Sequence, residues 1–304
     1  MKTMLSFIIL IATFISCNND DDASVTVQNP TAFGLSYSQS NQDFNTTFNR
    51  LQTSLQENSN IGIVAVVDHQ LNAQNVGLEL RPTREIIFGN PAIGTPIMQV
   101  NQLAGLDLPQ KMLVYQDADN NVFLGYNSAN YLAARHSDTG GASTIDQLST
   151  ALSNLAEGAT NGTVSENAST TVSDKQGINT TISNNDFETT YGNIKNAVTT
   201  NQNLILVAEV DHQANAASVA LTLRPTRLLI FGNPNLGTPL MQNSQTTGID
   251  LPQKILVWEA EDGSVNVSYN NPSYLVSRHG ITNNNETITT ITNALIMLSA
   301  SGTN

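Results

Sequence analysis

Apolar and polar residues alternate along the chain in two series of elements that have the same order. Each series begins with a short extended segment, at residues 33–38 and 178–183. A helix follows, indicated by apolar residues at intervals of three and four positions: Phe44, Phe48, Leu51 and Leu55 in the first series, and Phe187, Tyr191, Ile194 and Val198 in the second. The patterns Ser40-x-x-Asp43 and Ser183-x-x-Asp186 predict a capping box at each helix start.

The next residues of each series predict strands. Residues 61–69 form an apolar run that is typical of a strand buried on both faces, and 204–212 is its counterpart. Residues 77–90 supply a further strand that bends at Pro82, because proline cannot donate to a β-ladder. Residues 111–127 and 254–270 predict hairpins with polar turns.

Two further helices are expected in each series. Thr95-Pro96 and Thr238-Pro239 have the form of an N-cap followed by a first-turn proline, and so predict a short helix. A last amphipathic helix carries Ile145, Leu148, Leu152 and Leu155, or Ile288, Ile291, Leu295 and Leu298. The order is β-α-β-β-β-β-α with small inserted helices. Such an order predicts an α+β domain in which an antiparallel sheet carries its helices on one face.

The two series are copies of one unit at a constant offset of 143 residues. Residues 81–96 and 224–239 agree at twelve of sixteen positions, whereas the first helices, 44–60 and 187–203, agree at five of seventeen. Repetition of this kind predicts two tandem domains. We assign residues 33–157 to the first domain and 176–302 to the second. The Ser-, Thr-, Asn- and Gly-rich residues 158–175 form the linker. A duplicated unit readily replaces a homodimer, so we expect the copies to pair about a pseudo-twofold axis.

The N-terminus predicts an export signal. Lys2 precedes an apolar run that is too short to cross a bilayer as a helix. The run ends in Phe-Ile-Ser-Cys, which resembles a bacterial lipobox. This resemblance implies that residues 1–16 are removed, that Cys17 carries acyl chains, and that 17–32 form a tether to the cell envelope. The alternative is a cleaved secretory signal with an accidental cysteine. Cys17 is the single cysteine, so no intramolecular disulfide can form.

Several motifs recur in both copies and point to a family. VDHQ-x-NA, L-x-LRPTR-x-x-IFGNP-x-x-GTP-x-MQ, DLPQK-x-LV and SRHG together resemble the DUF302 family, a domain of unknown function. The resemblance covers nearly all of both copies and implies a fold similar to the TBP-like or helix-grip arrangement. The first copy departs from the pattern at Glu85, where an apolar residue is expected, and at residues 133–137. The family implies no activity.

The charged residues restrict the classes of partner. The chain carries 12 Lys and Arg against 25 Asp and Glu, a net charge of −13. This sign disfavours nucleic acid. Eight basic residues nevertheless form matched pairs between the copies: Arg81 and Arg224, Arg84 and Arg227, Lys111 and Lys254, Arg135 and Arg278. The matched carboxylates are Asp43 and Asp186 at helix caps, Asp119 and Asp262 in hairpin turns, Asp68 and Asp211, and Asp107 and Asp250.

Two interpretations of these charges remain open. In one, they pair within the domain, as Arg81 with Asp68 or Arg84 with Asp107. In the other, they bind a small anionic or amphipathic molecule, because arginine meets carboxylate or phosphate with two parallel hydrogen bonds. The candidate ligand-binding residues are Asp68, His69, Arg81, Arg84, Lys111, Arg135 and His136, with Asp211, His212, Arg224, Arg227, Lys254, Arg278 and His279 as their equivalents. Non-catalytic ligand binding is the leading hypothesis.

Three further hypotheses concern the same motifs. The Gly-Thr-Pro helix start could receive an anion on its free N–H groups, although no P-loop ending follows it. A metal or haem could bind His69, Met98, His136, His212, Met241 and His279, although no ligand spacing supports a metal. An enzyme could use His69 or His136 as acid-base, but no Ser or Cys nucleophile stands out. The sequence identifies no cofactor.

Overall fold

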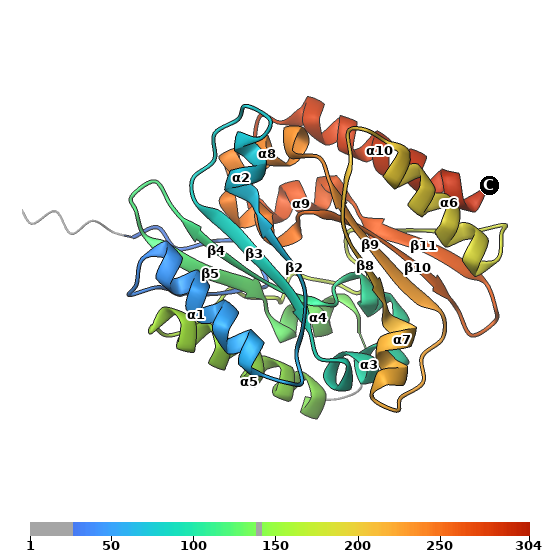
Figure 1. The fold of residues 1–304 in the computed structure, drawn as a ribbon, viewed down its shortest axis with the longest axis horizontal. Coiled ribbons are helices and arrows are strands. Elements are labelled where there is room, and N and C mark those ends of the chain that lie inside the picture. The colour runs from blue at the N-terminus through green and yellow to red at the C-terminus, as the bar shows by residue number, and fades with distance from the viewer. Residues whose placement is uncertain (1–26, 138–141) are drawn as a thin grey trace, which may run out of the picture.

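The computed structural model describes residues 27–137 and 142–304 of the chain. The predicted signal peptide, Cys17 and most of the tether lie outside these residues. Within them the chain forms two α+β domains side by side, each built on its own antiparallel sheet (Figure 1). The predicted fold class is therefore confirmed.

In the residues that the structure describes, the first domain contains five strands and five α-helices, and a short 3-10 helix between α3 and β4. In chain order these are β1 Leu35–Gln39, α1 Phe44–Glu57, β2 Gly62–Asp68, α2 His69–Gln74, β3 Thr83–Gly89, α3 Pro91–Val100, η1 Gln102–Leu106, β4 Gln110–Gln116, β5 Val122–Asn127, α4 Ala129–Arg135 and α5 Ala142–Thr160. The short strand β6 Ser165–Glu166 joins the far edge, so the sheet order is β2-β3-β4-β5-β1-β6.

The second domain repeats this order. Its elements are β7 Ile178–Ile182, α6 Phe187–Thr200, β8 Ile205–Asp211, α7 His212–Ser218, β9 Thr226–Gly232, α8 Pro234–Asn243, η2 Gln245–Asp250, β10 Gln253–Glu259, β11 Val265–Asn270, α9 Pro272–His279 and α10 Asn285–Thr303. The sheet order is β7-β11-β10-β9-β8. None of the helices in the described part of the chain has both the length and the apolar composition needed to cross a membrane.

Several helices begin at a different residue from the one that the sequence predicts. Asp43 caps α1, as the sequence indicated, but Asp43 and not Ser40 occupies the N-cap position, and its side chain accepts a hydrogen bond from Thr46 N. Helix α3 begins at Pro91 behind the N-cap Asn90, so that Pro96 lies inside the helix rather than at its start. The predicted anion position at the Gly-Thr-Pro segment is thus not a helix N-terminus. The Asn90 side chain itself accepts from Ala92 N at the true start.

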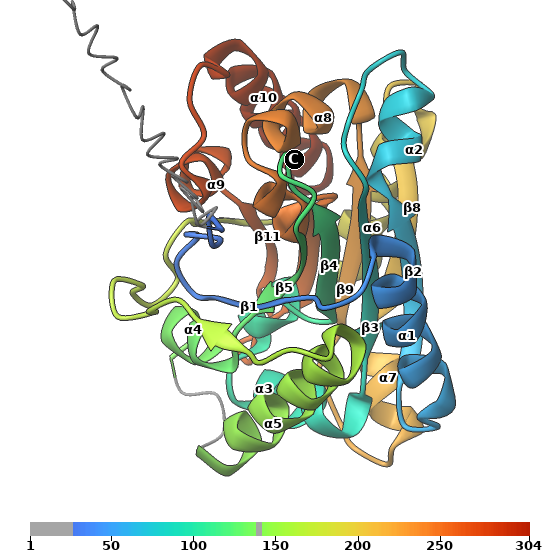
Figure 2. The same cartoon turned by 90° about the vertical axis from the view of Figure 1, so that its left-hand side faces the viewer.

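Each sheet uses both of its faces. Helices α1 and α5 cover one face of the first sheet, and α6 and α10 cover the corresponding face of the second (Figures 1 and 2). Between the domains lies a further apolar cluster to which both contribute, with Val67, Ile87 and Leu106 from the first and Val210, Leu228 and Leu256 from the second. The segment η1 lies on β9 and β10, and η2 lies on β3 and β4. Burial of this apolar surface holds the domains against each other.

The connecting segments also pack. Pro30 and Ala32, at the end of the predicted tether, are buried, and the Asn167 side chain donates to both of their carbonyl oxygens at 2.9 Å. The predicted linker begins in the last turn of α5 and contains β6, which pairs with β1. It ends at Lys175, whose N–H donates to Arg135 O. The linker thus follows the surface of the first domain into the second.

Candidate functional site

A buried ionic cluster holds many of the matched charges. The Arg135 guanidinium donates to both Asp107 oxygens at 3.0 and 2.7 Å, and His136 Nε2 lies 2.7 Å from Asp107 Oδ2. In the second copy Arg278 lies 2.9 Å from Asp250 Oδ2, and His279 Nε2 lies 2.7 Å from the same oxygen. Burial opposes the charge on Asp107, but Arg135, His136 and Lys254 outweigh it and hold the pKa of this carboxyl well below its usual range.

The same cluster ties the two domains together. Arg135 donates to Asn270 Oδ1 at 2.8 Å, and the equivalent Arg278 donates to Asn127 Oδ1 at 2.7 Å. Tyr131 and Tyr274, which are also equivalent, share a hydrogen bond of 2.9 Å between their hydroxyl groups. Each arginine lies over the tyrosine of the other copy, at 5.0 and 4.1 Å from the ring centroid. These reciprocal contacts explain why both copies retain the arginine although their sequences differ at many other positions.

The matched lysines enter the cluster at its centre. Lys111 Nζ lies 3.2 Å from Glu85 Oε1 and donates to Leu251 O at 2.7 Å. Lys254 Nζ lies 3.5 Å from Asp107 Oδ1, and burial lowers the pKa of Lys254. Burial raises the pKa of Glu85 to about 7, although Lys111 opposes the rise. Leu228 occupies the position of Glu85 in the second copy, so the cluster is asymmetric.

The remaining matched arginines lie nearer the surface. Arg84 Nη2 lies 2.6 Å from Asp68 Oδ2, while Asp68 Oδ1 caps α2 by accepting from Leu71 N. The pair of Arg227 and Asp211 repeats this contact at 3.0 Å. Arg81 and Arg224 are exposed and donate to Gln245 and Gln102 of the opposite domain. Six of the eight matched cations therefore face carboxylates, with partners that differ from those the sequence suggested.

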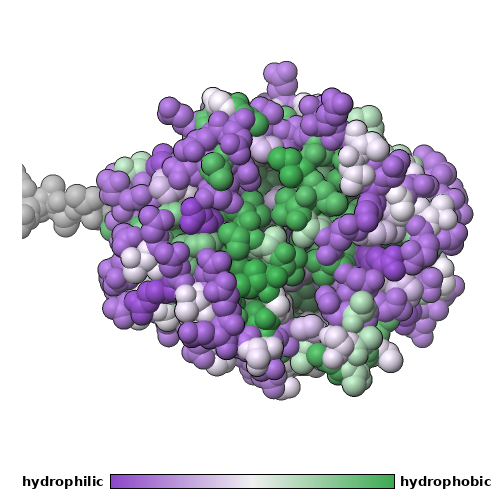
Figure 3. Space-filling view, in the orientation of Figure 1, coloured by the Kyte–Doolittle hydropathy of each residue, from purple (hydrophilic) through white to green (hydrophobic). Residues whose placement is uncertain are grey.

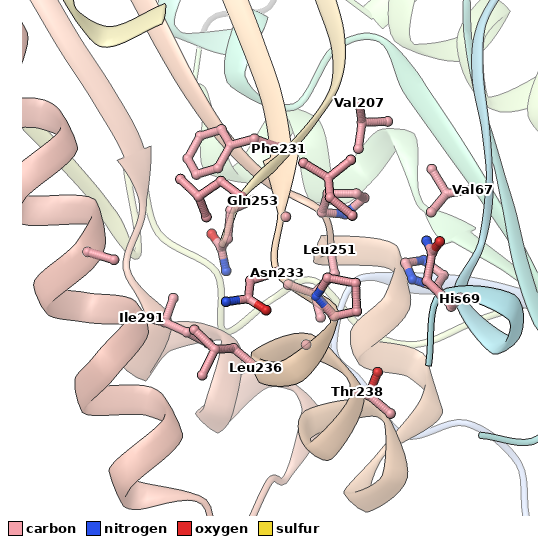
Figure 4. A pocket seen from close by; sticks show the side chains of 18 of the residues that line it. Val67, His69, Val207, Phe231, Asn233, Leu236, Thr238, Leu251, Gln253 and Ile291 are labelled. Carbon is pink, nitrogen blue, oxygen red and sulfur yellow. The ribbon is translucent and has the colours of Figure 1, made fainter. Parts of the chain in front are cut away.

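Two apolar pockets lie elsewhere, at the ends of the edge strands β2 and β8. The second-domain pocket has a cavity volume of about 80 Å³. The second domain contributes to its walls Phe231, Asn233, Leu236, Thr238, Leu251, Gln253, Ile291 and Leu295, and the first domain contributes Val67 and His69 (Figure 4). The first-domain pocket has a volume of about 780 Å³. Its walls include the equivalents Phe88, Asn90, Ile93, Thr95, Leu108, Gln110, Leu148 and Leu152, with Val210 and His212 from the second domain. Figure 3 shows apolar residues along a hollowed strip on this face of the molecule.

The pocket walls explain the close agreement of residues 81–96 with 224–239. The Phe-Gly-Asn-Pro segment ends the third strand of each domain and begins the next helix, and both parts line the pocket. The Leu-Pro-Gln segment lies directly opposite: a Cβ added to Gly89 would stand 3.2 Å from Pro109 Cβ. Glycine permits this close approach. Turn and helix geometry, which can be read from the sequence, account for these residues but do not reveal the cavity between them.

A few neutral polar groups face the apolar walls. Within the described residues, His69 Nε2, Thr238 Oγ1 and the amide of Gln253 have no hydrogen-bond partner in the second-domain pocket, nor has Thr95 Oγ1 in the first. Figure 4 shows the amides of Gln253 and Asn233 between Phe231 and Leu236, with His69 beside Val67 on the other side. Burial, with a contribution from Lys111, lowers the pKa of His69 to about 3.

The equivalent histidine of the first-domain pocket, His212, has a hydrogen-bond partner that His69 lacks. His212 Nε2 donates to Gly105 O at 3.2 Å. Burial lowers the pKa of His212 to about 4, and this bond opposes the shift. Both imidazoles are therefore neutral near pH 7. An unpartnered buried polar group costs about 1–3 kcal/mol of folding free energy. The pocket groups without a partner, which do not include His212, are therefore expected to bond with a ligand or water in the functional state.

The candidate metal ligands lie in three separate places. His69 and Met241 line the second-domain pocket, and His212 and Met98 line the first-domain pocket. His136 and His279 lie in the ionic cluster instead. Among residues 27–137 and 142–304, no group of three His, Cys, Asp or Glu side chains is arranged to hold a metal ion.

The molecule is thus a duplicated α+β protein whose repeated motifs surround two apolar pockets and one ionic cluster. It belongs to the family described as a domain of unknown function, DUF302, whose model matches residues 36–155 and 178–298. A DUF302 protein from Bacillus stearothermophilus of known structure aligns over 41% of this chain and 98% of its own. The TM-score is 0.38 and the identity is 15%.

Part of the chain also resembles curated proteins. Over 72 residues, 24% of this chain, it is 49% identical to the fluoride-specific ion channel FluC 1 of Brucella suis biovar 1 and to that of Brucella abortus biovar 1. The matched segment makes up 28% and 27% of those two proteins, so the chain spans about a quarter of their length.

Proposed function

We propose that this protein binds a small amphipathic molecule without transforming it, and that the binding sites are the two apolar pockets. The observation that carries the proposal is the repetition of the site. The most closely matched segments of the two copies line both pockets, together with a histidine from the opposite domain. An apolar cleft with a few placed polar groups is the usual form of a small-molecule site.

The ionic cluster supports a structural role for the other matched residues. Arg135 and Arg278 are buried, and each has bonds to both domains. A guanidinium that already donates to a carboxylate and an amide has few N–H groups left for a ligand. We therefore assign the ligand to the pockets and not to the arginines.

A chain-length series tests this function. Straight-chain amphiphiles of six to sixteen carbons are titrated against the purified chain while its unfolding temperature is recorded. Each buried methylene contributes about 0.8 kcal/mol, so the affinity should rise roughly fourfold per carbon until the pocket is full. Sodium fluoride is titrated in the same way as a test for binding of an inorganic anion, because the curated relatives are described as fluoride channels.

A pair of glycine variants makes the result specific to the site. Gly62 lines the first-domain pocket, and a Cβ added there meets no atom within 4 Å, so the position is open to a larger side chain and Gly62→Phe is the variant chosen to block the mouth. Gly192→Phe, at an equally open position on α6, is the matched control. We expect Gly62→Phe to abolish the chain-length effect and the control to retain it. Equal binding by both variants would contradict the proposed site.

The proposal includes a location on the cell envelope, held by acyl chains on Cys17. Its support is the lipobox-like end of the apolar N-terminal run. Cys17→Ser should move the protein from the membrane fraction to the soluble fraction, because two or more acyl chains are needed for stable anchoring. Ser24→Ala, in the same segment, should leave the distribution unchanged. Retention of the Cys17→Ser protein on membranes would contradict the anchor.

A further inference from the structure

The chemical character of the pocket walls restricts the ligand further than its shape does. Within the described residues, no Lys, Arg, Asp or Glu side chain lines either pocket. The polar wall groups are amides, hydroxyls and imidazoles, among them Asn233, Thr238 and Gln253 in the second-domain pocket. A charge transferred into such surroundings without a counter-charge loses its hydration and gains no ion pair.

The basic residue that acts on the His69 imidazole is already paired. Lys111 is close enough to His69 to influence its titration, but its ammonium group donates to Glu85 and to Leu251 O. It lies outside the lining of either pocket. A ligand carboxylate or phosphate would therefore find no free cation among the described residues that form the walls.

The unpartnered wall groups match a neutral head group. Thr95 and Thr238 each present a buried hydroxyl, and Gln253 presents both halves of an amide. Histidine Nε2 donates or accepts according to the tautomer, and a neutral imidazole has one nitrogen of each kind. A hydroxyl or amide on the ligand both donates and accepts, so it can bond with all of these groups, whereas a carboxylate can only accept.

We propose, on the basis of the function proposed above, that the ligand is an uncharged amphiphile with a hydroxyl or amide head. In the first-domain pocket the head bonds with Thr95, and in the second it bonds with Thr238 and with the Gln253 amide or the His69 imidazole. The first-domain pocket, with about 780 Å³, receives a long chain. The second-domain pocket, with about 80 Å³, receives only a short apolar group in its present form.

Three ligands of equal chain length test the head group. 1-Decanol, decanoate and decyltrimethylammonium are titrated by calorimetry at pH 8, where the second is an anion and the third a cation. We expect decanol to bind at least tenfold more tightly than either ion. Decanoate binding as tightly as decanol would overturn the neutral head group and leave the pocket function standing. If none of the three binds, the pocket function itself is wrong.

A conservative variant tests the contact. Thr95→Val keeps the shape of the side chain and removes the hydroxyl that the proposal uses. Decanol should bind about threefold to tenfold more weakly, as expected for the loss of one hydrogen bond, and the weak binding of decanoate should not change. Thr53→Val, on the exposed side of α1, is the control. An equal loss for decanol and decanoate, or no loss for decanol, would contradict the contact.

Discussion

The two pockets of this protein have the same walls but very different capacities. They share the Phe-Gly-Asn-Pro segment, the Leu-Pro-Gln segment and a histidine from the opposite domain, yet their volumes are about 780 and 80 Å³. One difference lies at the mouth, where the first pocket has Gly62 and the second has Ile205. The matched segments therefore form the walls that both pockets share, and the residues that differ between the copies determine the volume of each pocket.

The halves of the ionic cluster differ in a similar way. Asp107 accepts from Arg135 and His136 and also faces Lys254, whereas Asp250 accepts from Arg278 and His279. Glu85 gives the first half an additional acid where the second half has Leu228. Each pair of equivalent positions thus provides a variant in one copy and its internal control in the other.

The largest expected effect comes from the carboxylates of the cluster. Asp107→Asn leaves Arg135 and Lys254 buried without their anion, which should lower the free energy of unfolding by about 3–5 kcal/mol. Asp250→Asn removes the anion of one arginine, so its effect should be smaller. Urea unfolding followed by the fluorescence of Trp258 measures both. A loss for Asp250→Asn that equals or exceeds that for Asp107→Asn would show that the halves are equivalent.

The second prediction concerns the pH dependence that Glu85 brings to the first half. Its pKa is raised from 4.5 to about 7 in the folded state by burial. The contribution of Glu85 to stability is therefore fully present below pH 4.5 and is lost as the pH rises through 7. Over this pH range the free energy of unfolding should fall by about 3 kcal/mol.

Glu85→Leu, which copies Leu228 of the second half, removes the pH-dependent contribution of Glu85 to stability. The difference in unfolding free energy between the original chain and the variant should therefore change between pH 4.5 and 7.5, in favour of the variant at the higher pH. A difference that does not vary with pH would mean that Glu85 remains ionised beside Lys111. Asp119→Asn, in an exposed hairpin turn, is the control for a general effect of charge.

The sequence predicted the fold class and the family better than the side-chain contacts. Apolar periodicity and repeated turn residues gave the α+β class and the family correctly. The helix start at Asn90 was missed because Asn90-Pro91 and Thr95-Pro96 both have the form of an N-cap followed by proline. The chain continues the helix through Pro96 at the loss of one backbone bond.

The ion pairs could not be assigned from spacing, because they depend on register and on domain packing. Asp68 and Arg84 stand directly opposite in the β2–β3 ladder, a fact that only the register reveals. Arg135 bonds with Asn270, which belongs to the other domain. The pockets depend on the same packing, since each takes a histidine from the opposite copy. The close agreement of residues 81–96 with 224–239 was the sequence signal that could have identified them.

The third prediction exchanges the residues at the two pocket mouths. Gly62→Ile should weaken the binding of ten-carbon ligands in the first pocket by about tenfold, or 1.4 kcal/mol, because it occupies the space that the chain needs. Ile205→Gly should open the second pocket and raise the stoichiometry from one ligand per chain toward two. Titration calorimetry reports both quantities. If Ile205→Gly leaves the stoichiometry at one, residues deeper in the wall set the capacity, and the mouth does not.

The smallest expected effect concerns the buried threonines, Thr95 and Thr238. Each has a hydroxyl without a partner among the described residues, so replacement by valine removes a desolvated polar group and keeps the side-chain shape. In the ligand-free protein, Thr95→Val and Thr238→Val should each leave the free energy of unfolding unchanged or raise it by up to about 1 kcal/mol. The two variants should differ only when ligand is present, because Thr95 lines the larger pocket. A loss of more than about 1 kcal/mol without ligand would mean that the hydroxyl stabilises the fold itself, and the threonines would then be structural residues of the helix and not part of a binding site.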